Sequence, residues 1–79
     1  MSVEHKPDQR CFVFESDSQQ AFLSYRMPSD VHVEFLSTWV PEAMRGQGIA
    51  EQLVMTGLAW AKNNNYKISN RCWYLDRFL

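Results

Sequence analysis

The chain has 79 residues, which is enough for one domain near the size at which a single hydrophobic core is just sufficient. Hydrophobic residues make up 46% of the chain and aromatic residues 14%, and this composition excludes an intrinsically disordered segment. The net charge of −1 argues against nucleic-acid binding, and no run approaches the roughly 18 apolar residues of a membrane span.

The N-terminal residues and the cysteines indicate the compartment. Residues 1–10 are polar, so we expect neither a signal peptide nor a membrane anchor. Cys11 and Cys72 are too few for a disulfide framework and lack the spacing of a zinc site. These features predict a cytoplasmic protein with reduced thiols and no bound metal. We expect residues 1–9 to form a flexible tail and residues 10–79 a single domain.

Three strands are predicted in the first half of the chain, over residues 10–15, 19–27 and 31–40. Clusters of turn-forming residues separate them, so we expect an antiparallel meander. In the third strand apolar and polar residues alternate as far as Phe35. The alternation then slips at residues 36–38, which is typical of a β-bulge.

Residues 49–63 have the clearest periodicity in the chain, because their apolar side chains fall on one half of a helix. Within that face Gly57 costs about 1 kcal/mol relative to alanine, so we expect it to permit a close approach of the helix to a strand. Residues 66–71 are predicted to return as a strand parallel to the third, after a right-handed crossover. Residues 73–79 are predicted to form a short final helix. The fold class is therefore α+β.

The most informative segment is the turn between the third strand and the helix, Arg45-Gly46-Gln47-Gly48-Ile49-Ala50. Glycines allow close approach of a ligand to the backbone, and the first turn of a helix presents amides without intrahelical partners to an anion. A nucleotide P-loop is excluded because no Lys-Ser or Lys-Thr follows Gly48. A dinucleotide fingerprint is excluded because Glu51 stands where a third glycine or alanine is needed.

The pattern Arg-x-x-Gly-x-Ala resembles the signature of the GNAT superfamily of N-acetyltransferases, and the order of elements resembles a truncated GNAT fold. The likeness extends from Phe35 to Phe78 and is to a short class with a Gly-Gln-Gly-Ile turn and a later cysteine. The chain departs from that class at Ser37, where a histidine is usual, and at Asn70 and Trp73, where prolines are usual.

The resemblance implies a set of residues that bind acetyl-coenzyme A. The turn residues Arg45, Gly46, Gln47, Gly48, Ile49 and Ala50 would hold the pyrophosphate. The strand-end backbone at Thr38, Trp39 and Val40 would bond the pantetheine arm. Asn70 would bond the pantetheine amides or, alternatively, a carbonyl at the end of its own strand.

The resemblance also implies two residues near the thioester. Cys72 would be either a transient acyl acceptor or a residue that lines the acetyl group, and its alternative is a small buried hydrophobic residue. Tyr74 would protonate the departing thiolate, or would pack the terminal helix.

Other polar residues have plainer interpretations. Strand parity favours a solvated His32 and a solvated or ion-paired Glu34 over a general base. His5 is predicted to be inert in the tail, and Cys11 to lie in the core.

The sequence therefore favours a small acetyltransferase that transfers the acetyl group of acetyl-coenzyme A to a small amine or a protein. The alternative is an acyl-coenzyme A binding or sensing module without turnover, suggested by Ser37. A third hypothesis is an interaction domain that uses exposed Trp39 and Trp73. A monomer is favoured, without a nucleic-acid or membrane partner.

Overall fold

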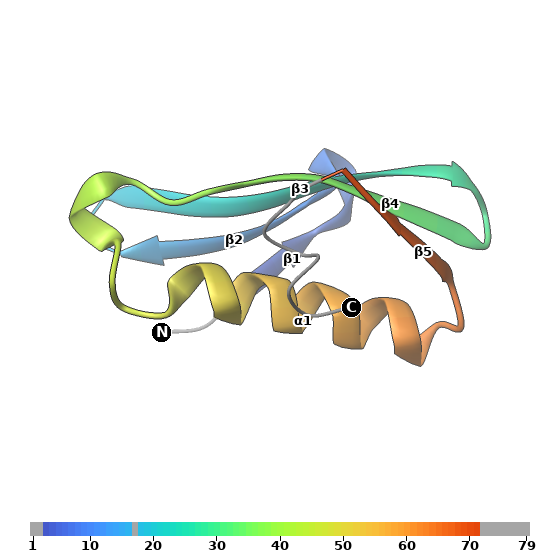
Figure 1. Ribbon diagram of the computed structural model, residues 1–79. Coiled ribbons are helices and arrows are strands. Elements are labelled where there is room, and N and C mark those ends of the chain that lie inside the picture. The colour runs from blue at the N-terminus through green and yellow to red at the C-terminus, as the bar shows by residue number, and fades with distance from the viewer. Residues whose placement is uncertain (1–2, 17, 72–79) are drawn as a thin grey trace.

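The computed structural model describes residues 3–16 and 18–71, which form a five-stranded sheet with one α-helix across one face (Figure 1). The elements follow the chain as β1 (Val3–Lys6), the 3-10 helix η1 (Pro7–Gln9), β2 (Cys11–Ser16), β3 (Gln19–Ser29), β4 (His32–Trp39), the 3-10 helix η2 (Glu42–Met44), α1 (Ile49–Asn63) and β5 (Lys67–Asn70). The sheet order is β1-β2-β3-β4-β5, antiparallel except for the parallel pair β4 and β5.

This architecture confirms the predicted α+β fold class, in which a meander precedes a helix and one parallel strand follows it. The helix has the predicted bounds, residues 49–63, and the three strands of the meander lie within one or two residues of their predicted positions. The meander has one strand more than expected. The helix predicted over residues 73–79 lies outside the described residues.

The prediction of a flexible tail over residues 1–9 is wrong for residues 3–6, which form the edge strand β1. This strand pairs antiparallel with β2 along its whole length. His5 stacks on Phe12 with the ring centroids 4.2 Å apart, and its Nε2 lies 2.6 Å from the hydroxyl oxygen of Tyr25. Stacking of the His5 ring on Phe12 therefore holds β1 against the sheet, although the composition of this segment is polar.

His5 belongs to an aromatic cluster beneath the C-terminal half of α1, formed by His5, Phe12, Tyr25, Trp60 and Tyr66. The Trp60 ring lies in the middle, with centroids 4.8 Å from His5, 5.0 Å from Tyr25 and 5.2 Å from Tyr66. Burial in the cluster lowers the pKa of His5 and raises the pKa of Tyr25. Both residues are therefore held in their neutral forms, and the Nε2 of a neutral His5 can accept a hydrogen bond from the Tyr25 hydroxyl.

The hydrophobic core fills the space between α1 and the sheet. Its largest fully buried side chains come from both layers and are Phe12, Leu23, Val33, Phe35, Leu53 and Val54. A Cβ built on Gly57 would lie 2.9 Å from Cδ2 of Leu23 and 3.1 Å from Cε1 of Phe35. The predicted close approach at Gly57 is therefore confirmed, because a side chain there would enter the space of two core residues.

Strand β4 contains the β-bulge that its sequence predicts. Ser37 pairs with Ser24 and Phe35 pairs with Tyr25, so the intervening Leu36 has no residue opposite it on β3. A bulge bends its strand and increases the local twist. The bend lies one residue beyond the last pair between β4 and β5, Phe35 and Asn70.

Candidate functional site

The predicted cofactor turn leads from the end of β4 into α1 and depends on two glycines with positive φ. Gly46 has φ +83° and Gly48 has φ +75°, a region that residues with a Cβ rarely adopt. A Cβ built on either glycine would meet no atom within 4 Å. Backbone conformation therefore favours glycine at both positions, and the space beside them is open.

The start of α1 presents backbone amides to this open space. Gly48 is the N-cap, and no side chain caps the helix there. The amide of Gln52 donates to the Gly48 carbonyl oxygen at 3.1 Å, which is the first bond of the helical type. The amides of Ile49, Ala50 and Glu51 precede it and have no intrahelical acceptor. The helix dipole adds positive potential at the same place.

These groups border a hollow of about 230 Å³ beside the turn. Its lining residues are Val40, Met44, Arg45, Gly46, Gly48, Ile49 and Ala50. Six of them follow one another closely in the chain, and Val40 comes from the end of β4. The hollow therefore joins the strand end to the helix start, as a cradle for an anionic ligand requires.

Arg45 is held at the rim of the hollow by two contacts. Its Nε donates to the carbonyl oxygen of Val40 at 3.0 Å. Its guanidinium carbon lies 5.6 Å from the centre of the Trp39 ring, within the range of a cation–π contact. The structure thus brings Trp39, Val40 and Arg45 together and places a permanent positive charge at the rim of the hollow.

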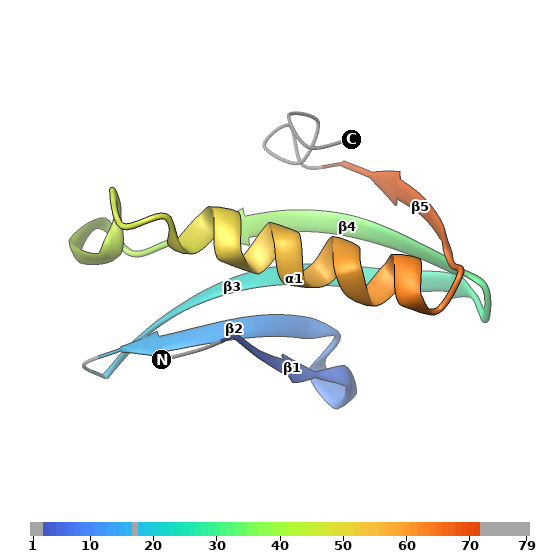
Figure 2. The same cartoon turned by 90° about the horizontal axis from the view of Figure 1, so that it is seen from below.

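Thr38 and Asn70 lie on β4 and β5, the parallel pair of strands. Within the described residues, β5 pairs with β4 from His32 to Phe35, and the two strands lie side by side (Figure 2). Asn70 is the last residue of β5 and pairs with Phe35, whereas Thr38 lies further along β4 and pairs with Leu23 on β3. The predicted residues Cys72 and Tyr74 lie outside the described residues.

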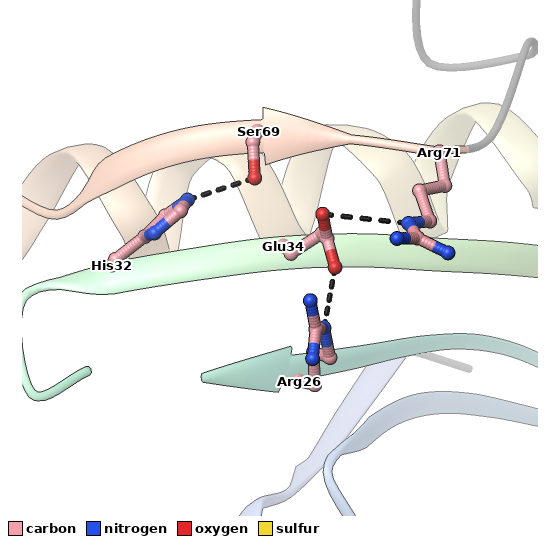
Figure 3. Close-up of polar contacts among 5 residues, drawn as sticks. All are labelled: Arg26, His32, Glu34, Ser69 and Arg71. Atoms are coloured by element: carbon pink, nitrogen blue, oxygen red, sulfur yellow. Dashed lines mark hydrogen bonds and ion pairs between the residues drawn. The ribbon is translucent and has the colours of Figure 1, made fainter. Parts of the chain in front are cut away.

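Three polar residues of β4 lie on the face of the sheet away from α1, namely His32, Glu34 and Ser37. Ser37 Oγ lies 2.9 Å from Ser24 Oγ, so the residue that replaces the usual histidine is bonded across the sheet. The interpretation of Glu34 as an ion-paired carboxylate is confirmed by its contacts with Arg26 and Arg71 (Figure 3). The hydrogen bond from Arg26 lowers the pKa of Glu34, and the charge of Arg71 acts in the same direction.

Two of the plainer predictions need correction. His32, expected to be solvated, is half-buried, and its Nε2 lies 2.8 Å from Ser69 Oγ on β5. Cys11, expected in the core, is only partly buried. Periodicity could not reveal the contacts that His32 and Glu34 make with the segment around β5. These contacts depend on the register of β4 and β5, which places side by side residues that are 37 positions apart in the chain.

Comparison with known proteins provides the evidence for the family of this chain. A family model described as GCN5-related N-acetyltransferase matches residues 11–79. The chain belongs to this family. Its relatives include Protein NATD1 of Gallus gallus, which is 30% identical over 81 residues, covering 100% of this chain and 74% of the relative. Protein NATD1 of Mus musculus is 30% identical over 79 residues, covering 98% of this chain and 72% of the relative.

Family membership confirms the resemblance that the turn from Arg45 to Ala50 suggests. Among residues 3–16 and 18–71, no group of histidine, cysteine or acidic side chains is arranged to bind a metal. The described helices likewise include none that is long and apolar enough to cross a membrane.

Proposed function

We propose that this member of the N-acetyltransferase family binds acetyl-coenzyme A at the turn between β4 and α1 and transfers the acetyl group to an amine. The observation that carries the proposal is the pair of positive-φ glycines at the uncapped start of α1. The pyrophosphate would lie against the amides of Gly48, Ile49 and Ala50, with Arg45 and Gln47 at the rim. The residues fit this ligand because the space beside both glycines is open.

The rest of the cofactor would lie beyond the last described pair of β4 and β5, Phe35 and Asn70. There the backbone of the segment 38–40 would bond the extended pantetheine arm as an added strand would. Trp39 would line this path and Asn70 would bond the pantetheine amides. The bound cofactor would supply the activated acetyl group, and the protein would contribute mainly positioning of the reactants.

Calorimetric titration with coenzyme A tests the pyrophosphate site through Gly48→Val. A β-branched side chain at φ +75° should lower affinity about tenfold or more, equivalent to about 1.4 kcal/mol. The matched control is Asn65→Val, which introduces the same side chain at φ +59° just beyond the other end of α1. The control carries similar backbone strain of about 1–3 kcal/mol but should retain the affinity. A folded Gly48→Val variant with unchanged affinity would contradict the site.

The role of Cys72 is tested by alkylation and by two substitutions. If Cys72 lines the acetyl site, coenzyme A should protect it from iodoacetamide. Cys72→Ala should then reduce turnover only about tenfold. A covalent acyl carrier would instead lose nearly all turnover in both Cys72→Ala and Cys72→Ser. We expect the lining role, with Tyr74 as the proton donor to the leaving thiolate. Equal alkylation with and without coenzyme A would remove Cys72 from the site.

The second candidate function is binding or sensing of acyl-coenzyme A without turnover. It is favoured by one observation, that Ser37 stands where the family usually has histidine and is bonded to Ser24 on the face away from α1. Release of free coenzyme A from acetyl-coenzyme A across a panel of small amines and peptides separates the two functions. Binding without release would favour the module, whereas absence of binding would leave the interaction-domain hypothesis.

A further inference from the structure

The face of the sheet away from α1 carries two exposed aromatic side chains beside each other. Phe22 alternates along β3 with the buried core residues Ala21 and Leu23, so its side chain lies on the opposite face. Trp39 on β4 is its cross-strand partner and shares that face. Phe22 is 36% exposed and Trp39 is 49% exposed. The two rings form an aromatic platform of the kind that contacts a partner.

Three cations lie on the same face, toward the other end of β3. Arg26 on β3 and Arg71 after β5 both contact Glu34 (Figure 3), and Lys67 on β5 pairs with His32. Glu34 is the one carboxylate among the residues of β3, β4 and β5. The arginine side chains contact it through Nε and remain 55% and 69% exposed. This end of the face therefore has a positive charge that Glu34 only partly balances.

The sign of the charge reverses toward the aromatic platform. Val13 on β2 pairs with Phe22 on one side and with Glu4 on the other, and Glu15 follows Val13 by two residues. Both carboxylates are exposed and lie on the face away from α1, near the platform. Lys6 follows Glu4 by two residues, in the direction of the cations. The face therefore complements a ligand with an amine at one end and an acid at the other.

The spacing of these groups sets the length of the ligand. Phe22 and Arg26 are four residues apart on one face of β3, so they lie about 13 Å from each other. An extended peptide covers that distance with about four residues. The face thus fits a short extended peptide with an apolar residue on the platform and an acidic residue at the arginines.

We propose that this face binds the acceptor, and that the acceptor is a peptide N-terminus with an apolar first residue and an acidic residue about four positions later. The inference rests on the proposed function, because the segment proposed to bond the pantetheine arm, 38–40, includes Trp39 of the platform. The opposite face gives no such access, since Leu23, Phe35 and Leu53 fill the space beneath α1.

The first residue of the acceptor rests on the platform beside the cofactor, and its acidic residue bonds Arg26 and Arg71. In the transfer, the neutral amine forms a C–N bond to the acetyl carbon and the C–S bond of the thioester breaks. The proton that the amine loses leaves with coenzyme A as its thiol.

Fluorescence anisotropy of three labelled peptides tests the surface without coenzyme A. The first peptide has an N-terminal phenylalanine and a glutamate about four residues later. The second has lysine in place of the glutamate, and the third has serine in place of the phenylalanine. The first should bind about tenfold more tightly than the second and about fivefold more tightly than the third. The advantage over the lysine peptide should shrink at about 1 M salt.

Two variants and two matched controls locate the binding. Arg26→Gln and Phe22→Ala should each weaken binding of the first peptide roughly fivefold. Lys62→Gln and Met55→Ala remove an exposed cation and an exposed apolar side chain from α1, and they should keep the affinity within about twofold. Equal binding of the glutamate and lysine peptides would overturn the proposal, as would an equal loss in the two controls.

Release of free coenzyme A separates this inference from the proposed function. Turnover with the first peptide, at a KM that rises in Arg26→Gln, would support both. Turnover with small amines but no peptide binding would overturn the inference and leave the proposed function in place. Peptide binding without turnover on any acceptor would refute the transfer and, with it, the acceptor role of this face. A dimer in sedimentation that Phe22→Ala dissociates would show a second copy on this face and would also overturn the inference.

Discussion

The two ends of helix α1 lie in opposite surroundings. At its C-terminal half, Trp60 contacts three aromatic rings within 5.2 Å, and His5 and Tyr25 are bonded to each other. At its N-terminus the helix has no side-chain cap, and the space beside Gly48 is open. One end of the helix therefore holds the fold together, while the other borders the open space where we propose that the ligand binds.

This difference makes a clear prediction for mutations. Substitutions in the aromatic cluster or the adjoining core should lower stability and leave the affinity of the folded protein for coenzyme A unchanged. Substitutions at the turn should lower the affinity for coenzyme A, and they should destabilise the fold only by the backbone strain that they introduce. Three changes can break or sharpen the distinction.

The largest effect is expected for Phe12→Ala. Phe12 is 1% exposed and stacks on His5, so its removal should reduce the free energy of unfolding by about 3–5 kcal/mol. The control is Phe22→Ala, because Phe22 is 36% exposed on the neighbouring strand and its loss should matter much less. Urea denaturation measures both variants.

Phe12→Ala removes much of the stability of so small a domain, so Phe12→Leu provides a milder version of the same test. The leucine variant should remain folded and retain its affinity for coenzyme A. An equal loss of stability in Phe12→Ala and Phe22→Ala would contradict the assignment of the core to the helix side of the sheet.

A smaller effect is expected for Gly57→Ala. The new methyl group gains about 1 kcal/mol of helix propensity but lies too close to Leu23 and Phe35, at 2.9 and 3.1 Å. Overpacking of about 1–3 kcal/mol should exceed the gain, for a net loss of about 1 kcal/mol. The exposed neighbour Thr56 provides the control, since Thr56→Ala should be neutral or slightly stabilising. A stabilised Gly57→Ala would show that the helix can move off the sheet.

The smallest effect is the pH dependence contributed by His5. Its pKa in the fold is lowered from 6.5 by burial, so the unfolded chain binds the proton more readily. The contribution of His5 is therefore fully present above pH 6.5 and is lost as the pH falls through 6.5 toward the lower pKa of the folded state. Glu34 titrates in a separate window, below 4.5.

This contribution is tested by thermal unfolding at several values of pH between about 7.5 and 5, a range of about 2.5 units that spans the ordinary pKa of histidine. His5→Phe keeps the ring stacked on Phe12 and should flatten the pH dependence. An unchanged slope in His5→Phe would show that β1 is not held by the neutral imidazole.

The turn at the start of α1 could be predicted from the sequence, because it depends on local patterns. The turn could be placed because a strand, two glycines and a helix follow one another within a short segment, 31–63. The bulge at Leu36 and the close approach at Gly57 could also be predicted, because each breaks a regular pattern in its own element.

The features that the sequence did not reveal depend on contacts between residues that are distant in the chain. β1 was hidden because its composition is polar, and His5 is covered by rings on other elements, Phe12, Tyr25 and Trp60. The link from Glu34 to Arg71 was hidden because it requires the register of β4 and β5. Strand alternation could assign each residue to a face, but it could not identify its partner across the sheet.

An NMR titration of the wild-type protein with coenzyme A tests the central claim most directly, because it reports on both ends of α1 in one experiment. The account predicts that the amide signals of Gly46, Gly48, Ile49 and Ala50 shift most, while the indole N–H signal of Trp60 stays in place. Unshifted turn amides, or shifts centred on Trp60, would contradict it.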